Sequence, residues 1–414
     1  MLFKAKAIVL STGGVGKAWK FTSNSWECTG DGITLGLDAG ADLIDMECIQ
    51  FHPTGMVWPT SVRGILVTEG VRGDGGTLKN SEGARFMFNY IPEYFKGETA
   101  DNEKEADAWY EDKKNNRRTP DLLPRDEVAR AINSEVKAGR GSPHGGVFLD
   151  INTRRSADYI RKRLPSMYHQ FKELAGVDIT KESMEVGPTC HYIMGGIRVD
   201  ADTEATAVPG LFAAGEVAGG MHGANRLGGN SLSDLLVFGR RAGLAAAEYV
   251  KSLAGKVSVD GGQAEAAAQT LLEPLTRSGN ENPYAIHADL QECMQALVGI
   301  IRTEGELRKA LEEIAVFKQR LGRVRVGGGR EFNPGWHLAL DLHSMLSVSE
   351  AVTLGAIERK ESRGGHTRDD YPFADDRFGK INVVIRRKNG QLTVAQEPLP
   401  EMPDELKQLL QERK

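Results

Sequence analysis

Two segments early in the chain combine a histidine, a hydroxyl, an acid and an arginine with glycine or proline turns. The segment "IQFHPTG" places His52 after an apolar run, and "LVTEGVRGDGG" carries Thr68, Glu69 and Arg72. Glycine turns let a backbone approach a ligand closely, and charges beside them are costly to bury unless they are paired. Both segments are therefore candidates for a binding site.

Three later segments add residues of the same kind. The segment "LLPRDEVARAI" sets Arg125 and Asp126 at the expected start of a helix, while "GPTCHYIMGGI" and "GGMHGANRLGG" contribute His191, His222 and Arg226. An acid suits a helix N-terminus, whereas the positive charge of Arg125 opposes the helix dipole there. A functional role therefore explains Arg125 better than helix stability does.

Together these residues are typical of a pocket for a small dianion. A fork of arginine donors or a histidine–hydroxyl pair could hold each carboxylate of such a ligand. Taken singly, the segments have simpler explanations. His52 could be a structural loop residue, and Glu69 and Arg72 could form a surface ion pair on a turn.

A second group of residues favours a flavin. Glu216 ends "PGLFAAGE", which has the pattern of a buried parallel strand, and an acid at that place suits a ribose or ribityl hydroxyl. The amides of residues 231–233 open a predicted helix, where they suit an electron-rich ring or a phosphate. Because a helix N-terminus stabilises negative charge, it would also favour a reduced flavin ring.

Composition narrows the class of protein. The chain has 414 residues, which predicts two or three compact units, and its net charge of -5 argues against nucleic-acid binding. Its four cysteines are widely spaced without a CxxC pair, which argues against a disulfide framework, a zinc site or a cysteine-held iron–sulfur cluster in this chain. The pattern indicates a reducing compartment. No apolar stretch is long enough to span a bilayer.

The pattern of apolar, glycine and capping residues predicts the strands and helices that would position these residues. "KAIVLSTGGVG" predicts a strand and a glycine loop of a nucleotide-binding α/β unit, and Asp31 stands at the entry of the helix that follows. Apolar residues recur at helical spacing in residues 262–362, and Asn333 is expected to cap a helix whose first residue is Pro334. "INVVIRRKNGQLTVAQ" predicts a hairpin that turns at Asn389 and Gly390.

Nine motifs in order resemble the flavoprotein subunits of succinate dehydrogenase and fumarate reductase, most closely those of succinate dehydrogenases. They cover essentially the whole chain: "STGG", "TGDG", "QFHPTG", "TEGVRGDGG", "PRDEVAR", "PTCHYIMGG", "AAGE", "GANRLGGNSLSDLLVFGRRAG" and "ESRGGHTRDDYP". The resemblance implies an α/β fold: part of a Rossmann-like FAD-binding domain with an inserted α+β capping domain, then a helical domain and a small C-terminal domain. The expected segments are 1–45 and 191–261 (FAD-binding), 46–190 (capping), 262–362 (helical) and 363–414 (C-terminal).

The same resemblance implies a role for individual residues. His52 and Thr68 would hold one carboxylate of the substrate, and His191 and Arg226 would hold the other. Arg125 would be the proton donor and acceptor, with Glu69 and Arg72 relaying protons to it. The residues that would contact FAD are Asp31, Glu216, Ser231 and Leu232.

Arginine is an unusual acid–base group, because its guanidinium normally stays protonated. Reduction of fumarate would leave a strongly basic carbanion, and a dry pocket that already holds Arg72, Arg226 and histidines disfavours another cation. These two effects make proton transfer by Arg125 more plausible chemically, and the resemblance favours that role. The alternative is that Arg125 only stabilises developing negative charge.

The implied reaction is the interconversion of succinate and fumarate by hydride transfer to or from FAD, as in the tricarboxylic acid cycle and electron transport. Electrons would pass to an iron–sulfur subunit, and a membrane anchor would hold the complex peripherally at the cytoplasmic face of the inner membrane. The alternatives are an L-aspartate oxidase-like enzyme, or a non-catalytic flavoprotein remnant that only binds partner subunits.

One part of the family pattern is not in this sequence. The family's flavoproteins begin with a strand, a GxGxxG-type turn and a histidine that bonds FAD covalently, and none of these motifs occurs here. We therefore expect the covalent attachment site to lie outside this chain, which is either a fragment or is completed by another polypeptide.

Overall fold

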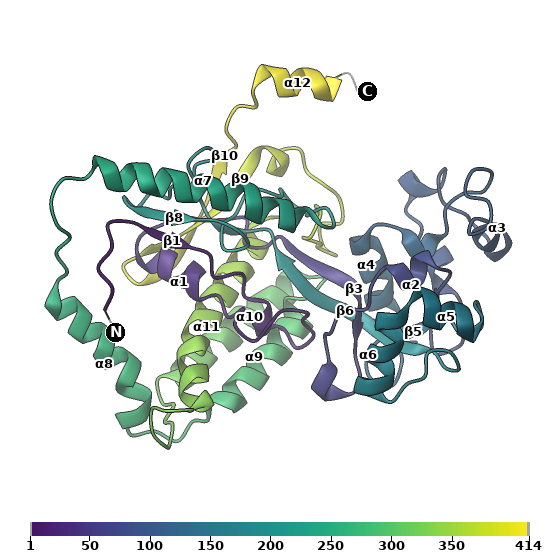
Figure 1. The fold of residues 1–414 in the computed structure, drawn as a ribbon, viewed down its shortest axis with the longest axis horizontal. Helices are drawn as coiled ribbons and strands as arrows, with labels where there is room; N and C mark the ends of the chain where they lie inside the picture. The colour runs from purple at the N-terminus through teal and green to yellow at the C-terminus, as the bar shows by residue number, and fades with distance from the viewer. Residues whose placement is uncertain (1, 412–414) are drawn as a thin grey trace.

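A parallel pair of strands joins the start of the chain to a segment two hundred residues later. In the computed structural model, which describes residues 2–411, β1 (Ile8–Leu10) pairs with β8 (Leu211–Ala213), Ile8 opposite Leu211. The long helix α7 (Asn230–Ser252) runs along this pair (Figure 1). This is the predicted α/β arrangement, in which a helix N-terminus follows a strand that ends in an acid.

A separate α/β unit extends to one side of the molecule (Figure 1). Its antiparallel sheet has the strand order β3-β6-β5-β4, and five helices lie in the same stretch of the chain. Their apolar side chains form a core of their own, which includes Met56, Val128 and Phe171. The elements are β3 (Ile49–Met56), α2 (Gly70–Gly73), β4 (Thr77–Lys79), α3 (Glu103–Ala108), α4 (Arg125–Lys137), β5 (Val147–Asp150), α5 (Ala157–Arg163), α6 (Pro165–Ala175) and β6 (Met184–Ile193).

Three long helices, at residues 283–297, 304–321 and 334–358, contribute a large part of the other core. As predicted, the side chain of Asn333 accepts a hydrogen bond from the Trp336 amide, and Pro334 is the first residue of the helix. That helix, α11, is apolar almost all round and is buried between its neighbours and α1. The bounds are α1 (Asp31–Asp38), α8 (Gly261–Thr276), α9 (Pro283–Leu297), α10 (Glu304–Leu321) and α11 (Pro334–Glu358).

The C-terminal segment adds a hairpin to a third sheet. Asn389 and Gly390 have φ values of 51° and 79°, so both turn residues are left-handed, as this two-residue turn requires. This confirms the predicted hairpin. The sheet order is β10-β9-β2-β7, with β2 (Leu43–Ile44), β7 (Gly196–Ile197), β9 (Ile381–Lys388) and β10 (Gln391–Pro398). A last helix, α12 (Asp404–Gln411), projects from the body of the molecule (Figure 1).

Six short 3₁₀ helices occur in the connecting segments of residues 2–411. They are η1 (Gly16–Ala18), η2 (Thr60–Val62), η3 (Phe86–Tyr90), η4 (Glu93–Phe95), η5 (Pro120–Leu122) and η6 (Phe378–Lys380). Over the same residues, no helix has the length and apolar character needed to cross a membrane. The boundaries of the five predicted segments stay predictions.

Buried ion pairs brace the segment that leads into β3. Arg359, which directly follows α11, bonds the carboxylates of Asp45 and Glu47, a few residues before β3. Farther on, the amide of Gly365 donates to the carbonyl of Ala224 at 2.7 Å. The segment "ESRGGHTRDDYP" and the residues just before it therefore support both β3 and the loop that carries Arg226.

Candidate active site

Two neighbouring cavities share Arg226 in their walls. The first, which we call the α4 cavity, has a volume of about 580 Å³ and is lined by Glu69, Arg125, Asn225, Arg226 and Gly228, among others. The second, the α7 cavity, has a volume of about 500 Å³, and its lining includes Ser11, Gly13, His191, Tyr192, Glu216, Arg226, Ser231 and Leu235. Six of the eleven sequence-predicted site residues therefore line two adjoining spaces: Glu69, Arg125, His191, Glu216, Arg226 and Ser231.

The two candidate histidines lie on adjacent strands. His52 is on β3 and His191 on β6, and their ring centroids are 5.6 Å apart. The pairing of these strands shifts register just before Phe51 and again after His52, and such bulges re-aim the side chains next to them. The irregular strand thus brings both rings to the same place.

Burial and nearby cations keep both histidines neutral. Burial, followed by Arg125, His191 and Arg72, holds the pKa of His52 well below its usual value. Burial, followed by Arg226 and Arg125, lowers the pKa of His191 to about 4. Because the same cations that lower these pKa values attract anions, the site is prepared for a negatively charged ligand.

A chain of charged side chains leads from the α4 cavity into the capping unit. Arg125 is the first residue of α4, and its Nε donates to Glu69 Oε2 at 3.2 Å. The same oxygen lies 4.0 Å from an Nη of Arg72, which is fully buried. Arg72 bonds the carbonyl of Asp121, but its Nε and second Nη have no hydrogen-bond partner among residues 2–411. Burial lowers the pKa of Arg72. Glu69 therefore lies between Arg125 and Arg72 in space, and the proton relay through these three residues stays a prediction.

A glycine makes room for the guanidinium of Arg125. A Cβ placed on Gly228 would lie 3.2 Å from Arg125 Nη2, closer than an ordinary contact. The next residue, Gly229, has a φ of 83° and immediately precedes α7. The glycine loop before α7 thus lets Arg125 pack against its backbone.

Arg226 is held on three sides. One Nη donates to Ser231 Oγ at 3.0 Å, the other donates to Gln50 Oε1 at 3.0 Å, and the guanidinium lies 4.4 Å from the ring centroid of Tyr192. Burial lowers its pKa, and its Nε has no partner within the described residues. The arrangement leaves an oriented cation with free donors.

Glu216 places a partly buried carboxyl group in the wall of the α7 cavity. It accepts the Ile193 amide at 3.0 Å, and burial raises its pKa to about 7. The glycine loop after β1 packs directly on it, because a Cβ on Gly14 would lie 2.4 Å from Glu216 Oε1. Gly13 and Gly215 both have positive φ, so the backbone on each side of this carboxyl group needs glycine.

Three predicted residues lie apart from these groups. Thr68 is exposed, and its hydroxyl accepts the Gly70 amide at 3.2 Å. Asp31 accepts the Thr29 hydroxyl at 2.8 Å and lines a different cleft, between α1, α8, α10 and α11. Leu232 is 68% exposed at the start of α7. Their contacts with substrate or FAD stay predictions.

The sequence reading did not single out Gln50, Tyr192 or Gly228, although each touches a predicted site residue. Gln50 carried a usable signal, because a polar residue inside an apolar strand must be hydrogen-bonded to something. Tyr192 and Gly228 carried none of comparable strength, since a tyrosine in a strand and one more glycine in a loop are both ordinary.

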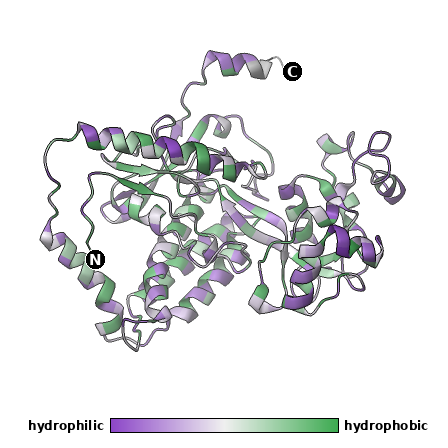
Figure 2. Ribbon diagram, viewed as in Figure 1, coloured by the Kyte–Doolittle hydropathy of each residue, from purple (hydrophilic) through white to green (hydrophobic). Residues whose placement is uncertain are grey.

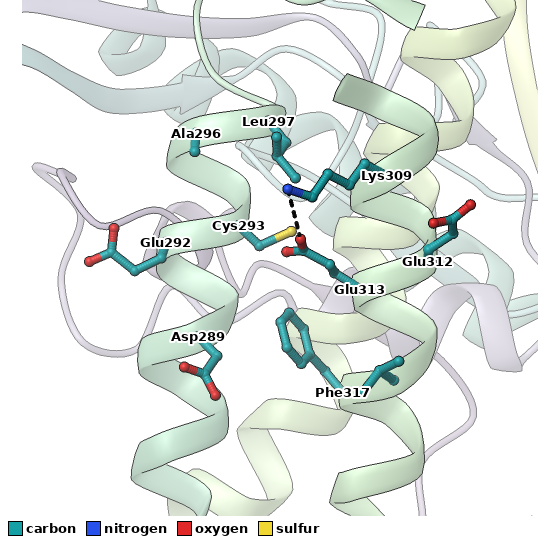
Figure 3. A pocket seen from close by; sticks show the side chains of 10 residues that line it. Asp289, Glu292, Cys293, Ala296, Leu297, Lys309, Glu312, Glu313 and Phe317 are labelled. Carbon is teal, nitrogen blue, oxygen red and sulfur yellow. Dashed lines mark ion pairs between the residues drawn. The ribbon is translucent and has the colours of Figure 1, made fainter. Parts of the chain in front are cut away.

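Another cavity lies between α9 and α10, away from these residues (Figure 3). It has a volume of about 500 Å³, and its wall includes Cys293, Lys309 and Glu313. Lys309 and Glu313 form an ion pair at 3.7 Å, and burial and the neighbouring Glu313 raise the pKa of the Cys293 thiol. A thiol in that state is a poor nucleophile. The cavity therefore does not compete with the α4 and α7 cavities as an active site.

Comparison with known proteins adds independent information. A family model described as "FAD binding domain" matches residues 1–232, and one described as "Fumarate reductase flavoprotein C-term" matches residues 287–409. The chain is 42% identical to a CoM/CoB fumarate reductase protein of Methanothermobacter marburgensis over 386 residues, which cover 93% of this chain and 64% of that protein. It is 38% identical to the succinate dehydrogenase flavoprotein of Coxiella burnetii over 388 residues, 91% and 61% of the two chains.

The fold is similar to a solved structure as well. Mycobacterium smegmatis Sdh1 in complex with UQ1 is 58% identical, with a TM-score of 0.84, and the match covers 98% of this chain and 64% of that one. These similarities confirm the predicted fold class and the resemblance seen in the motifs. The chain spans somewhat less than two thirds of the length of these relatives.

The α7 cavity fits the FAD that the family model indicates as cofactor. No side chain within residues 2–411 caps the N-terminus of α7, so the positive end of the helix dipole is open to an electron-rich group, although the amides of Asn230 and Leu232 already donate to the carbonyls of Leu227 and Gly229. Glu216 offers an acceptor for a ribityl or ribose hydroxyl, and exposed Leu235 offers an apolar surface. The hydroxyl of Ser231, at the same helix start, accepts a hydrogen bond from Arg226.

Proposed function

Because the chain belongs to the FAD-binding flavoprotein family of succinate dehydrogenases and fumarate reductases, we propose that it forms part of an enzyme that interconverts succinate and fumarate. One observation carries the proposal: Arg226 lines both the α4 cavity and the α7 cavity. A substrate bound to Arg226 would therefore lie next to the cofactor.

The two carboxylates of the substrate would be held by two pairs of groups. His191 and Arg226 would bind one carboxylate, and His52 with Thr68 would bind the other. Nδ1 of His52 lies 3.1 Å from the Thr54 carbonyl and 3.3 Å from the Thr54 amide; when Nδ1 accepts that amide, the proton of the neutral ring is on Nε2 and can be donated to the carboxylate. Binding of a dianion would raise the pKa values of both histidines. The affinity for the ligand would therefore increase as the histidines take up protons.

Proton transfer would be the task of Arg125. FAD, when bound, supplies the hydride acceptor for succinate oxidation and the donor for the reverse reaction. In succinate oxidation the neutral guanidine form of Arg125 would take a proton from the substrate carbon and become a guanidinium, and in fumarate reduction the guanidinium would give that proton to the carbon. Its Nε contacts Glu69 Oε2, the oxygen that also lies close to Arg72, so that Glu69 would exchange protons with Arg125 after each turnover.

Partner proteins follow from the same family membership. We propose that electrons leave through an iron–sulfur protein and that a membrane anchor holds the complex at the cytoplasmic face of the inner membrane. The names of the relatives support this only for the flavoprotein part, since they describe flavoprotein subunits. Co-purification of an iron–sulfur protein with the complete flavoprotein tests it.

Turnover tests the proposed reaction directly. The flavin-loaded complete enzyme should reduce an artificial electron acceptor with succinate and oxidise a reduced dye with fumarate. Arg226→Ala should lose both activities, because it removes the cation next to the cofactor. Reduction of the dye by L-aspartate in place of succinate would contradict the proposal and indicate an L-aspartate oxidase-like enzyme. A folded, flavin-loaded protein that acts on neither substrate would indicate a non-catalytic role.

A further inference from the structure

Gln50 is a polar side chain near the start of a fully buried strand. It stands on β3 between Ile49 and Phe51, and only 3% of its surface is exposed. A buried amide without hydrogen bonds would destabilise the strand. The partners of Gln50 therefore show why this position holds an amide.

The side-chain amide of Gln50 bonds both the guanidinium and the backbone carbonyl of Arg226. Gln50 Oε1 accepts from an Nη of Arg226 at 3.0 Å, while Gln50 Nε2 donates to the carbonyl of Arg226 at 2.7 Å. Nε2 also donates to Asn225 Oδ1 at 2.8 Å. The opposite orientation of the amide would set donor against donor at the guanidinium and acceptor against acceptor at the carbonyl. Both the backbone and the side chain of Arg226 are thus fixed by one residue.

The neighbouring strand supports the same guanidinium. Gln50 is paired with Tyr192 across β3 and β6, and the ring of Tyr192 lies under Arg226. Gln50 therefore restrains the guanidinium in its own plane, while Tyr192 restrains it from the face. The remaining Nη protons of Arg226, which lines both cavities, are left for a ligand, whereas its Nε is buried and has no partner among residues 2–411.

We propose that Gln50 is a positioning residue that orients Arg226 for the substrate carboxylate. Because Gln50 and His52 are both on β3, the bonds of Gln50 also fix the distance between Arg226 and His52. This inference rests on the proposed function and names a residue for the same site. Removing the amide would free the guanidinium to turn toward other acceptors and would leave the carbonyl of Arg226 without its donor.

Binding of malonate, a dicarboxylate that does not react, provides the test. Calorimetry on the flavin-loaded enzyme should show that Gln50→Leu binds malonate about tenfold more weakly than wild type, the scale of one lost hydrogen bond to a charged group. Gln50→Glu keeps the shape of the side chain and should also weaken binding, because its carboxylate pairs with Arg226 and competes with the ligand. Gln291→Leu is the matched control. Gln291 is a partly buried glutamine that bonds the carbonyl of Lys17, and its loss should leave malonate affinity unchanged.

A double-mutant cycle separates positioning from general structural damage. If Gln50 acts through Arg226, then Gln50→Leu should change malonate affinity less than about twofold in an Arg226→Ala background. An equal loss in both backgrounds would overturn the inference, as would wild-type affinity in Gln50→Leu or Gln50→Glu. Failure of the wild-type enzyme to bind malonate would instead contradict the proposed function.

Discussion

At the scale of single residues, Arg125 carries the proposed chemical step and can be separated from ligand binding. It contacts Glu69 at 3.2 Å and lines the α4 cavity alone, whereas Arg226 lines both cavities. We expect Arg125→Ala to lower kcat by about 10²-fold or more, the range for an essential acid–base group, with a much smaller effect on malonate binding. Steady-state turnover and calorimetry measure the two effects. Near-normal turnover would remove Arg125 from proton transfer.

The histidines should make ligand binding depend on pH. The pKa of His191 is about 4 in the ligand-free protein, and a bound carboxylate raises it. Binding therefore takes up protons at pH values between the free pKa of about 4 and the higher bound pKa, so malonate affinity should increase as the pH falls through the bound pKa toward 4. Calorimetry in buffers of different ionisation enthalpy measures this uptake. The slope should be smaller in His191→Asn, and an affinity that weakens as the pH falls through this range would contradict the prediction.

Glu216 should affect stability and cofactor retention in opposite directions. Its folded-state pKa of about 7 lies above the ordinary value of 4.5, so the folded protein holds an extra proton between these pH values. The free energy of unfolding should therefore decrease as the pH rises from 4.5 to 7 and stay low above 7. Glu216→Gln removes this titration and should raise the Tm of the FAD-free protein at about pH 8. The same variant should retain FAD less well. A lower Tm at that pH would show that burial of the carboxylate does not destabilise the fold.

At the scale of elements, the glycine loop before α7 sets the position of Arg125 on α4. A Cβ at residue 228 would press on the guanidinium at 3.2 Å, so Gly228→Ala should shift it by a few tenths of an ångström. We expect a loss of roughly tenfold in kcat with little change in Tm, because catalysis is sensitive to small displacements of a reacting group. Gly305→Ala on α10, where no described atom lies within 4 Å of the new Cβ, is the matched control and should keep full turnover.

The elements that local signals define were predictable from the sequence. The Asn389–Gly390 turn, the Asn333 cap with Pro334, and the start of α4 at Arg125 each depend on residues within a few positions of one another. The register shifts around His52, and with them the pairing of Gln50 with Tyr192, depend on contacts between strands more than a hundred residues apart. The cleft that holds Asp31 also forms from distant helices. Motifs identified the residues, and tertiary packing decided their neighbours.

At the scale of the whole molecule, the exposed surface of helix α7 and strand β1 is unusually rich in large apolar side chains. Hydrophobic and hydrophilic residues alternate along α7 in Figure 2, and several large apolar side chains are exposed on it. β1 pairs only with β8 among the described strands, and Ile8 and Val9 are exposed. The exposed apolar residues of α7 are Leu232, Leu235, Leu236, Val237 and Leu244.

This surface leads to a prediction for the 414 residues as an isolated polypeptide. A dinucleotide is normally held by a first βαβ unit, whose glycine turn binds the pyrophosphate and whose acid binds the ribose. The described residues offer Glu216 and the N-terminus of α7, which would contact only part of such a cofactor. Open strand edges and apolar surfaces also favour aggregation. We therefore expect the isolated polypeptide to be poorly soluble and to carry far less than one FAD per chain.

Two measurements test this expectation. Flavin absorbance per protein after purification gives the occupancy, and dye reduction with succinate gives the activity, which should be absent. Leu236→Lys, which replaces the most exposed leucine of α7, should improve solubility without raising FAD occupancy, because it covers no part of the cofactor. Co-expression with the remaining third of a 58% identical relative's chain should raise both solubility and occupancy, since that part would cover α7 and complete the nucleotide site. Stoichiometric FAD with measurable turnover in the isolated polypeptide would show that Glu216 and the α7 N-terminus suffice to hold the cofactor.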